Sequence, residues 1–202
     1  MSHRVAAVAS LPVGLWLVGR APAGAPRLGV GVFALCITAM FTASAVMHWR
    51  VWSPDTTEVL NRADHTAIYL AIAGTATAVA ALGLSGGWQA ALLWGVWGIA
   101  AIGIVIEWFP AATPRGLAHT LYLVLGWATV PFVPLIASRT GWGTVALMLA
   151  GGLFYTVGAV IVAIRRPDPR PEVFGYHEVW HLFVVVAVGF HYAMVAEALP
   201  AV

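Results

Sequence analysis

Residues 28–49 read LGVGVFALCITAMFTASAVMHW and contain no Asp, Glu, Lys or Arg. A helix that crosses the hydrocarbon core of a bilayer needs about 20 apolar residues, because each residue adds only about 1.5 Å along the helix axis. We therefore predict that this segment is a membrane-spanning helix.

The composition of the chain also favours a membrane protein. Of the 202 residues, 61% are hydrophobic and only 9% are charged, whereas a soluble domain carries about 25% charged residues. Such a chain has too little polar surface to cover a core in water. Its length suits one compact domain over residues 1–202 and leaves no room for a second, soluble domain.

Six more apolar segments lie on either side of the first one. With it, the predicted spans are Val5–Gly19, Leu28–Trp49, Asp64–Leu84, Trp88–Ile106, Leu117–Ser138, Trp142–Ile164 and His177–Leu199. Breaks fall at runs such as RAPAGAPR at 20–27 and RRPDPRP at 165–171, which cannot continue a helix. The first segment is short and starts like a signal peptide, but the segments after it favour a first spanning helix. The sequence thus predicts an all-α bundle of seven transmembrane helices.

The arginines predict the orientation of this bundle, because seven spans place the two termini on opposite sides of the membrane. The side of the N-terminus carries Arg4, Arg50, Arg62, Arg115, Arg165, Arg166 and Arg170, and the other side carries Arg20, Arg27 and Arg139. Cytoplasmic loops are enriched in basic residues. We therefore expect the N-terminus in the cytoplasm and the C-terminus outside.

The composition excludes several other classes of protein. All basic residues are Arg and they are scattered between apolar segments, so nucleic-acid binding is not expected. The single cysteine, Cys36, cannot form an internal disulfide and is expected to be a packing residue. A retinal-binding rhodopsin needs a Lys for its Schiff base, and the chain has none. The sequence leaves the oligomeric state open.

Ionisable side chains are costly inside a bilayer, so each one near a span needs a reason. Three predicted spans carry such groups at their ends: His48; Asp64 and His65; and His177, Glu178 and His181. In the topology above, all three of these ends lie on the cytoplasmic side. The sequence therefore predicts a cluster of ionisable groups at one membrane depth.

The histidines of this cluster have the spacing of metal ligands. His177 and His181 are four residues apart and share one helix face at about 5–6 Å, and His48 can reach the same ion from another helix. Three protein ligands and one water are typical of catalytic zinc. Asp64 can accept a proton from that water, and Ser44, one turn before His48, can orient the groups around the metal.

Each of these residues also has a structural interpretation. His48 alone would be an interfacial histidine bonded to a backbone carbonyl. Ser44 would be a small packing residue, and Asp64 would cap the N-terminus of the third span. Their coincidence at one depth is what favours zinc.

The string HEVWH at 177–181 also fits the His-Glu-x-x-His motif of zinc proteases, in which the Glu is the general base. Those enzymes need a third ligand, usually downstream, and only His191 and Glu197 follow here. His191 lies about 15 Å along the helix from His181, too far for a ligand of the same ion. We therefore expect Glu178 to be a first-turn carboxylate that the helix dipole favours.

At these positions the sequence resembles a known family. SAVMH at 44–48, RADHTAIYLAIAGT at 62–75 and YHEVWHLFVVVAVGFHY at 176–192 are similar to motifs of the hemolysin III family. That family is the bacterial branch of the progestin and adiponectin receptor family and is distantly similar to alkaline ceramidases. The resemblance runs over nearly the whole chain.

The resemblance implies a seven-helix protein of the bacterial inner membrane, with zinc held by His48, His177 and His181 and accompanied by Ser44 and Asp64. The function it implies is hydrolysis of a lipid amide or ester by zinc-activated water, with a membrane lipid or fatty-acyl compound as substrate and a role in membrane lipid homeostasis. The alternative is a zinc-stabilised sensor, receptor or haemolysin-type protein without catalysis. The resemblance gives His65 no role.

Overall fold

The fold is built almost entirely of α-helices. A computed structural model of the chain describes residues 2–109 and 117–200, except for the side chains of residues 2, 118 and 119. The helices are α1 (Ser2–Arg20), α2 (Ala25–Met47), α3 (Pro54–Gly83), α4 (Gly86–Trp108), α5 (Leu117–Gly126), the short 3-10 helix η1 (Val130–Phe132), α6 (Val133–Ile164) and α7 (Tyr176–Ala198). The predicted all-α fold class is therefore confirmed.

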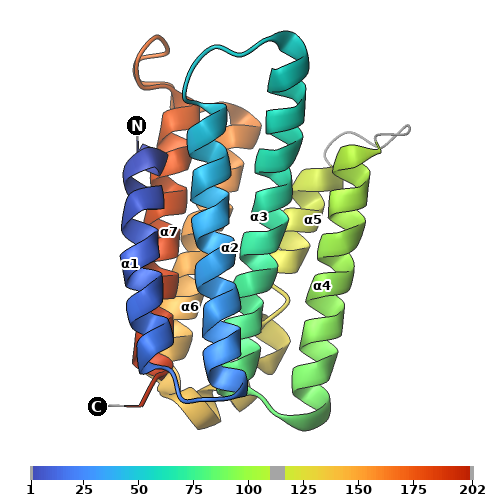
Figure 1. The fold of residues 1–202 in the computed structure, drawn as a ribbon, viewed down its shortest axis with the longest axis vertical. Coiled ribbons are helices and arrows are strands. Elements are labelled where there is room, and N and C mark those ends of the chain that lie inside the picture. The colour runs from blue at the N-terminus through green and yellow to red at the C-terminus, as the bar shows by residue number, and fades with distance from the viewer. Residues whose placement is uncertain (1, 110–116, 201–202) are drawn as a thin grey trace.

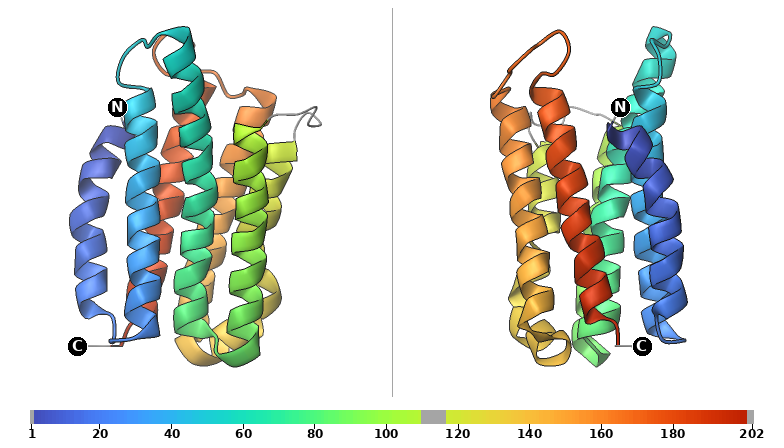
Figure 2. Two further views of the ribbon diagram at one scale, coloured as in Figure 1. Left: turned by 45° about the vertical axis from the view of Figure 1, so that its right-hand side comes forward. Right: turned by 90° about the vertical axis from the view of Figure 1, so that its left-hand side faces the viewer.

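The helices stand side by side in one bundle (Figure 1). The N-terminus and the α2–α3 and α6–α7 connections lie at the upper end in that view, and the C-terminus lies at the lower end. α1 packs against α2 and α7, and α3 packs against α2, α4 and α6. α7 runs between α6 and α1 (Figure 2). The end of α2 and the start of α7 therefore meet at the upper end of the bundle.

Five segments of the described chain are long and apolar enough to cross a membrane. They are Ala25–Met47, Pro54–Gly83, Gly86–Trp108, Thr120–Ile164 and Tyr176–Ala198. Thr120–Ile164 takes in most of α5 together with η1 and α6, and α1 is not among the five. The chain is thus a polytopic membrane protein, and the count of seven spans stays a prediction.

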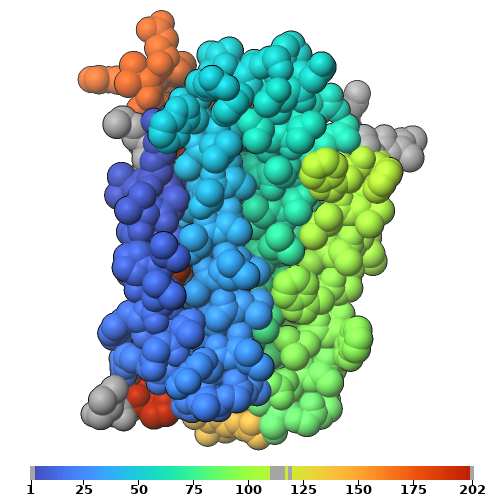
Figure 3. Space-filling view, in the orientation of Figure 1, coloured from blue at the N-terminus to red at the C-terminus, as the bar shows by residue number. Residues whose placement is uncertain are grey.

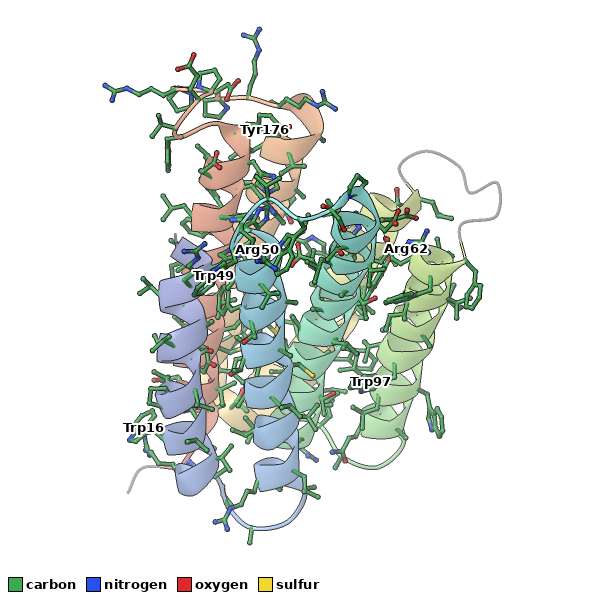
Figure 4. The ribbon with its side chains drawn as sticks, turned by 45° about the horizontal axis from the view of Figure 1, so that its top comes forward. Trp16, Trp49, Arg50, Arg62, Trp97 and Tyr176 are labelled. Carbon is green, nitrogen blue, oxygen red and sulfur yellow. The ribbon has the colours of Figure 1, made fainter. Side chains whose placement is uncertain are left out.

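The outer surface of the bundle is apolar along much of its length. Trp94 on α4 is 82% exposed and Val8 on α1 is 77% exposed. Figure 3 shows α1, α2, α3 and α4 packed side by side on one face of this surface. Trp16 and Trp49 lie toward opposite ends of the bundle (Figure 4), where the two membrane interfaces are expected. Such a surface suits contact with lipid. Apolar side chains face outward, and the backbone polar groups are satisfied within the helices.

α3 begins ten residues earlier than predicted, and this changes the position of Asp64 within the helix. Ser53 is the N-cap, and its hydroxyl accepts a hydrogen bond from the N–H of Thr56 (3.4 Å). Pro54 occupies the first turn, where its missing N–H is no loss. Residues 54–63 are rich in polar side chains, so hydropathy alone predicts a loop there. Asp64 lies inside α3, and its interpretation as the N-cap is wrong.

The predicted span Leu117–Ser138 is not one continuous helix. α5 ends at Gly126, and a turn and η1 separate it from α6. Pro131 and Pro134 lie at this break, where each lacks the N–H that a continuing α-helix uses. The backbone leaves helical geometry again at Gly141, with φ of 85° and ψ of 162°, close to the predicted boundary between the fifth and sixth segments.

α2 and α3 approach each other closely because small residues line their contact. A side chain on Gly74 of α3 would place its Cβ 2.8 Å from the Cβ of Cys36 on α2. Small residues are common where membrane helices meet, since they let the backbones approach. Cys36 is a buried free thiol, as expected of a packing residue.

Candidate metal centre

The last turn of α2 places His48 at the upper end of the bundle. His48 directly follows α2, and its N–H donates to the carbonyl of Ser44 (3.1 Å). The indole N–H of Trp52 donates to the carbonyls of Val46 and Met47 at 3.2 and 3.1 Å, and the carbonyl of Val46 also accepts the N–H of Trp49 (3.1 Å). These bonds fix the helix end that carries His48.

The first two turns of α7 place His177 and His181. The carboxylate of Glu178 accepts a hydrogen bond from the N–H of Gly175 (2.9 Å). The carboxylate of Asp168 accepts one from the N–H of Tyr176 (3.0 Å). Both bonds satisfy N–H groups that a helix start leaves unpaired. Glu178 is therefore the first-turn carboxylate that the sequence predicted. The rings of His177 and His181 follow each other by one turn, with centroids 4.5 Å apart.

Three histidine rings from two helices meet at this point. The ring of His48 has its centroid 5.2 Å from that of His177 and 5.1 Å from that of His181. Each residue offers a ring nitrogen, and these atoms lie within 4.8 Å of one another. Tetrahedral zinc with bonds of about 2.0–2.1 Å sets its ligand atoms about 3.4 Å apart, so small side-chain rotations close the difference. The three histidines therefore form a possible metal site.

A free ring nitrogen supports this fit. Nε2 of His177 is buried, and it has no hydrogen-bond partner among the described residues. A buried nitrogen of this kind is costly unless something binds it. A metal ion held by the three rings would satisfy it.

Ser44 and Asp64 lie beside the histidines. Ser44 is 3% exposed and lies on α2 one turn before His48. Its hydroxyl lies close to the carboxyl group of Asp64, which reaches the same place from α3. Among the described residues, the ligand atoms that lie within 4.8 Å of one another belong to the three histidines, and Asp64 is not one of this group. It therefore stands next to the three rings, outside the set of possible ligands.

A cavity of about 220 Å³ extends from the histidines into the bundle. Ser44, Asp64 and the three histidines line its polar part. Most of the other side chains that line the cavity are apolar, among them Ile72, Val79, Leu125, Met148 and Val184. The cavity therefore joins a polar end to an apolar wall.

Comparison with known proteins agrees with the motifs in the sequence. The family model described as Haemolysin-III related matches residues 1–192. The chain belongs to this haemolysin III family. Hemolysin-3 of Bacillus cereus is 30% identical over 191 residues, which are 92% of this chain and 83% of that protein. The Hemolysin-3 homolog of Bacillus subtilis (strain 168) is 34% identical over 155 residues, 76% of this chain and 69% of that protein.

Family and fold together give the location of the protein. A haemolysin III protein with five candidate transmembrane segments is a multi-pass membrane protein of bacteria.

A fourth histidine of this haemolysin III protein, which was not predicted from the sequence, lies against His181. His3, in the first turn of α1, is only 7% exposed. Its ring stacks on that of His181, and its Nδ1 shares a hydrogen bond with the hydroxyl of Ser44 (2.8 Å). One signal for it was present: His3 precedes the first apolar segment on the same predicted side as His48. The argument from equal depth therefore applies to it as well.

Two further histidines lie outside the group of three. His65 Nδ1 is 3.1 Å from Oε2 of Glu107, so His65 links α3 to α4. His191, 8% exposed, lines the same cavity from α7 two to three turns after His181. Neither belongs to the group of close ligand atoms. His65, which the sequence left without a role, has a structural one.

Proposed function

We propose that this haemolysin III protein is a zinc-dependent integral membrane hydrolase that cleaves a lipid amide or ester, as a ceramidase does. The observation that carries the proposal is the convergence of His48, His177 and His181 at the polar end of an apolar cavity. The hydrolase acts on a membrane lipid or fatty-acyl compound and serves membrane lipid homeostasis.

Zinc is the metal that this donor set fits best. Imidazole nitrogens are typical zinc ligands, and three protein ligands leave one coordination position for the reaction. A bound zinc ion supplies activation of a water molecule and polarisation of a carbonyl group. Proton transfer and the orientation of the reacting groups are the proposed roles of the protein's own side chains.

Asp64 is the residue proposed to accept and deliver the proton. It lies on α3, a different helix from all three histidines, so it can serve the reaction without occupying the metal. Ser44 lies close to its carboxyl group, and its proposed role is to orient that group. The reaction then needs no Ser or Cys nucleophile.

The cavity fits a lipid substrate. Its histidines lie at one end of the bundle, where lipid head groups are found, and its apolar lining extends along the helices. Ligand pockets combine an apolar lining with a few placed polar groups in this way. An acyl chain would lie against Ile72, Val79 and Met148 while its amide or ester group faces the histidines.

We further propose seven membrane spans with the N-terminus in the cytoplasm and the C-terminus outside. The termini lie at opposite ends of the bundle (Figure 1). The described arginines toward the upper end are Arg4, Arg50, Arg62, Arg165, Arg166 and Arg170, and those toward the lower end are Arg20, Arg27 and Arg139. Arg115 lies outside the described residues. An excess of basic residues is typical of the cytoplasmic side.

A second candidate is a zinc-stabilised membrane sensor or haemolysin-type protein without catalysis. The observation that favours it is the name of the Bacillus cereus relative, which is that of a hemolysin and not of a hydrolase. In this case zinc would only stabilise the upper end of the bundle.

Release of fatty acid distinguishes the two candidates. Purified protein in detergent is stripped of metal, reloaded with zinc and incubated with ceramides and other acyl-amide and acyl-ester lipids. We expect release from the zinc-loaded protein alone. No release from any of these lipids, or equal release with and without zinc, would contradict the hydrolase and favour the sensor.

A further inference from the structure

The first turn of α1 contacts one of the possible metal ligands directly. The ring of His3 lies flat on the ring of His181, with centroids 3.9 Å apart and an interplanar angle of 10°. Its Nδ1 shares a hydrogen bond with the hydroxyl of Ser44 (2.8 Å), and Phe41 meets the ring edge-on at 5.2 Å. These three neighbours fix the orientation of the His3 ring. The ring of His181 in turn packs flat against the ring of His3.

The next residue, Arg4, contacts the helix end that carries another possible ligand. Its guanidinium donates to the carbonyls of His48 and Trp49 at 3.1 and 2.9 Å. It also lies over the ring of Trp49, 4.5 Å from the centroid, at the upper end of the bundle (Figure 4). A cation is favourable here, because the C-terminal end of a helix leaves carbonyls unpaired and carries a partial negative charge. Arg4 therefore holds the backbone from which His48 projects.

α1 has other attachments to the same two helices. The hydroxyl of Ser10 donates to that of Thr38 on α2 (3.1 Å), and Tyr192 on α7 donates to the carbonyl of Ser10 (3.2 Å). These bonds dock α1 between α2 and α7 without any contribution from its first turn. What His3 and Arg4 add is therefore local to the histidine cluster.

Packing alone does not explain a histidine at position 3. Its Nε2 is buried and has no hydrogen-bond partner in the part of the chain that the structure describes. An unsatisfied buried nitrogen lowers stability, so burial alone does not favour an imidazole in this place. The imidazole of His3 combines a hydrogen bond to Ser44 with ring contact on His181, and phenylalanine could not make the hydrogen bond.

We propose that the first turn of α1 is part of the metal centre. His3 positions the ring of His181 and the hydroxyl of Ser44. Arg4 positions the end of α2 and, with it, His48. The inference rests on the metal site of the proposed function but does not depend on hydrolysis.

The test is a measurement of zinc affinity on the full-length protein in detergent, by competition with a chromophoric chelator and without lipid substrate. Loss of a group that orients metal ligands commonly weakens binding about 10–100-fold, and we expect losses of this size for His3→Ala and Arg4→Ala. The visible absorption bands of the cobalt-substituted protein, which report ligand geometry, should shift in both variants. His3→Phe keeps a ring on His181 and should lose less affinity. It also replaces His3→Ala if that variant does not fold.

Arg20→Ala is the matched control, because Arg20 makes the same kinds of contact at the other end of α1. Its guanidinium lies over Trp16 (5.0 Å) and donates to the carbonyl of Pro200 (3.3 Å). We expect wild-type zinc affinity in Arg20→Ala. An equal loss there, or wild-type affinity and an unchanged cobalt spectrum in the His3 and Arg4 variants, would overturn the inference. Wild-type protein that binds no zinc would overturn the proposed function together with it.

Discussion

Gly151 on α6 packs directly against the imidazole of His191 on α7. A side chain at Gly151 would place its Cβ 2.5 Å from Nε2 of His191 and 3.1 Å from the carbonyl of Ala187. Both neighbours belong to α7, whose first two turns supply two of the three clustered histidines. The close contact between these two helices at this point therefore depends on the absence of a side chain at Gly151.

Gly151→Ala should destabilise the protein by about 1–3 kcal/mol, the usual result of overpacking. The neighbouring Gly152 provides the control, since a Cβ there would meet only Trp127, at an ordinary distance of 3.8 Å. Gly152→Ala should be neutral or slightly stabilising, because alanine is the better helix former. Thermal unfolding in detergent measures both, and equal unfolding temperatures would contradict the packing described for α6 and α7.

Cysteine labelling in intact cells distinguishes seven spans from five. Asp55 and Glu172 are exposed at the upper end of the bundle and Ala23 is exposed at the lower end. In a Cys36→Ala background, cysteines at 55 and 172 should be protected from an impermeant reagent and one at 23 should react. If Thr120–Ile164 crossed the membrane only once, positions 55 and 172 would lie on opposite sides. Labelling of position 172 but not 55 from outside would therefore contradict the seven-span topology.

The metal site predicts about one zinc ion per chain in purified protein. His48→Ala, His177→Ala and His181→Ala should each lower zinc content, because each removes one nitrogen from the cluster. His65→Ala should retain zinc, since His65 is bonded to Glu107 and stands outside the cluster. Elemental analysis by mass spectrometry gives the content. Full occupancy in all three cluster variants would exclude these residues as ligands.

Glu178→Gln separates the proposed hydrolase from a metalloprotease-like enzyme. The amide oxygen of Gln can still accept the N–H of Gly175, so the start of α7 should be preserved. We expect wild-type zinc content and wild-type release of fatty acid. Loss of activity with zinc retained would instead make Glu178 the general base, as in the His-Glu-x-x-His proteases.

The fold was predictable where hydropathy decides it. α2, α4 and α7 begin and end within three residues of the predicted spans, because lipid-facing helices are apolar throughout. The start of α3 and the end of α5 were missed for a physical reason. Those boundaries are set by the N-cap Ser53 and by two prolines after Gly126, and these act on backbone hydrogen bonds, which hydropathy does not measure.

The part of the site that depends on spacing along the chain and on depth in the membrane was predictable. His177 and His181 share a helix face at four residues' spacing, and depth in the membrane brings His48 to the same level. Membrane depth would place His3 at the same level, but its particular contacts with Ser44 and His181 cross between three helices. No spacing along the chain encodes such a contact. The alternative for Asp64, a helix cap, could be discarded only once the structure gave the true start of α3.

The proposed role of Asp64 is tested most directly by fatty-acid release per bound zinc ion in Asp64→Asn. Asp64 lines the same cavity from α3 and lies outside the three-histidine cluster, so the variant should retain its zinc and its unfolding temperature. Loss of a general base typically costs about 100-fold or more in rate, and release per zinc should fall by at least that factor. Release per zinc equal to that of the wild type would contradict the hydrolase mechanism and leave the protein a zinc-stabilised sensor.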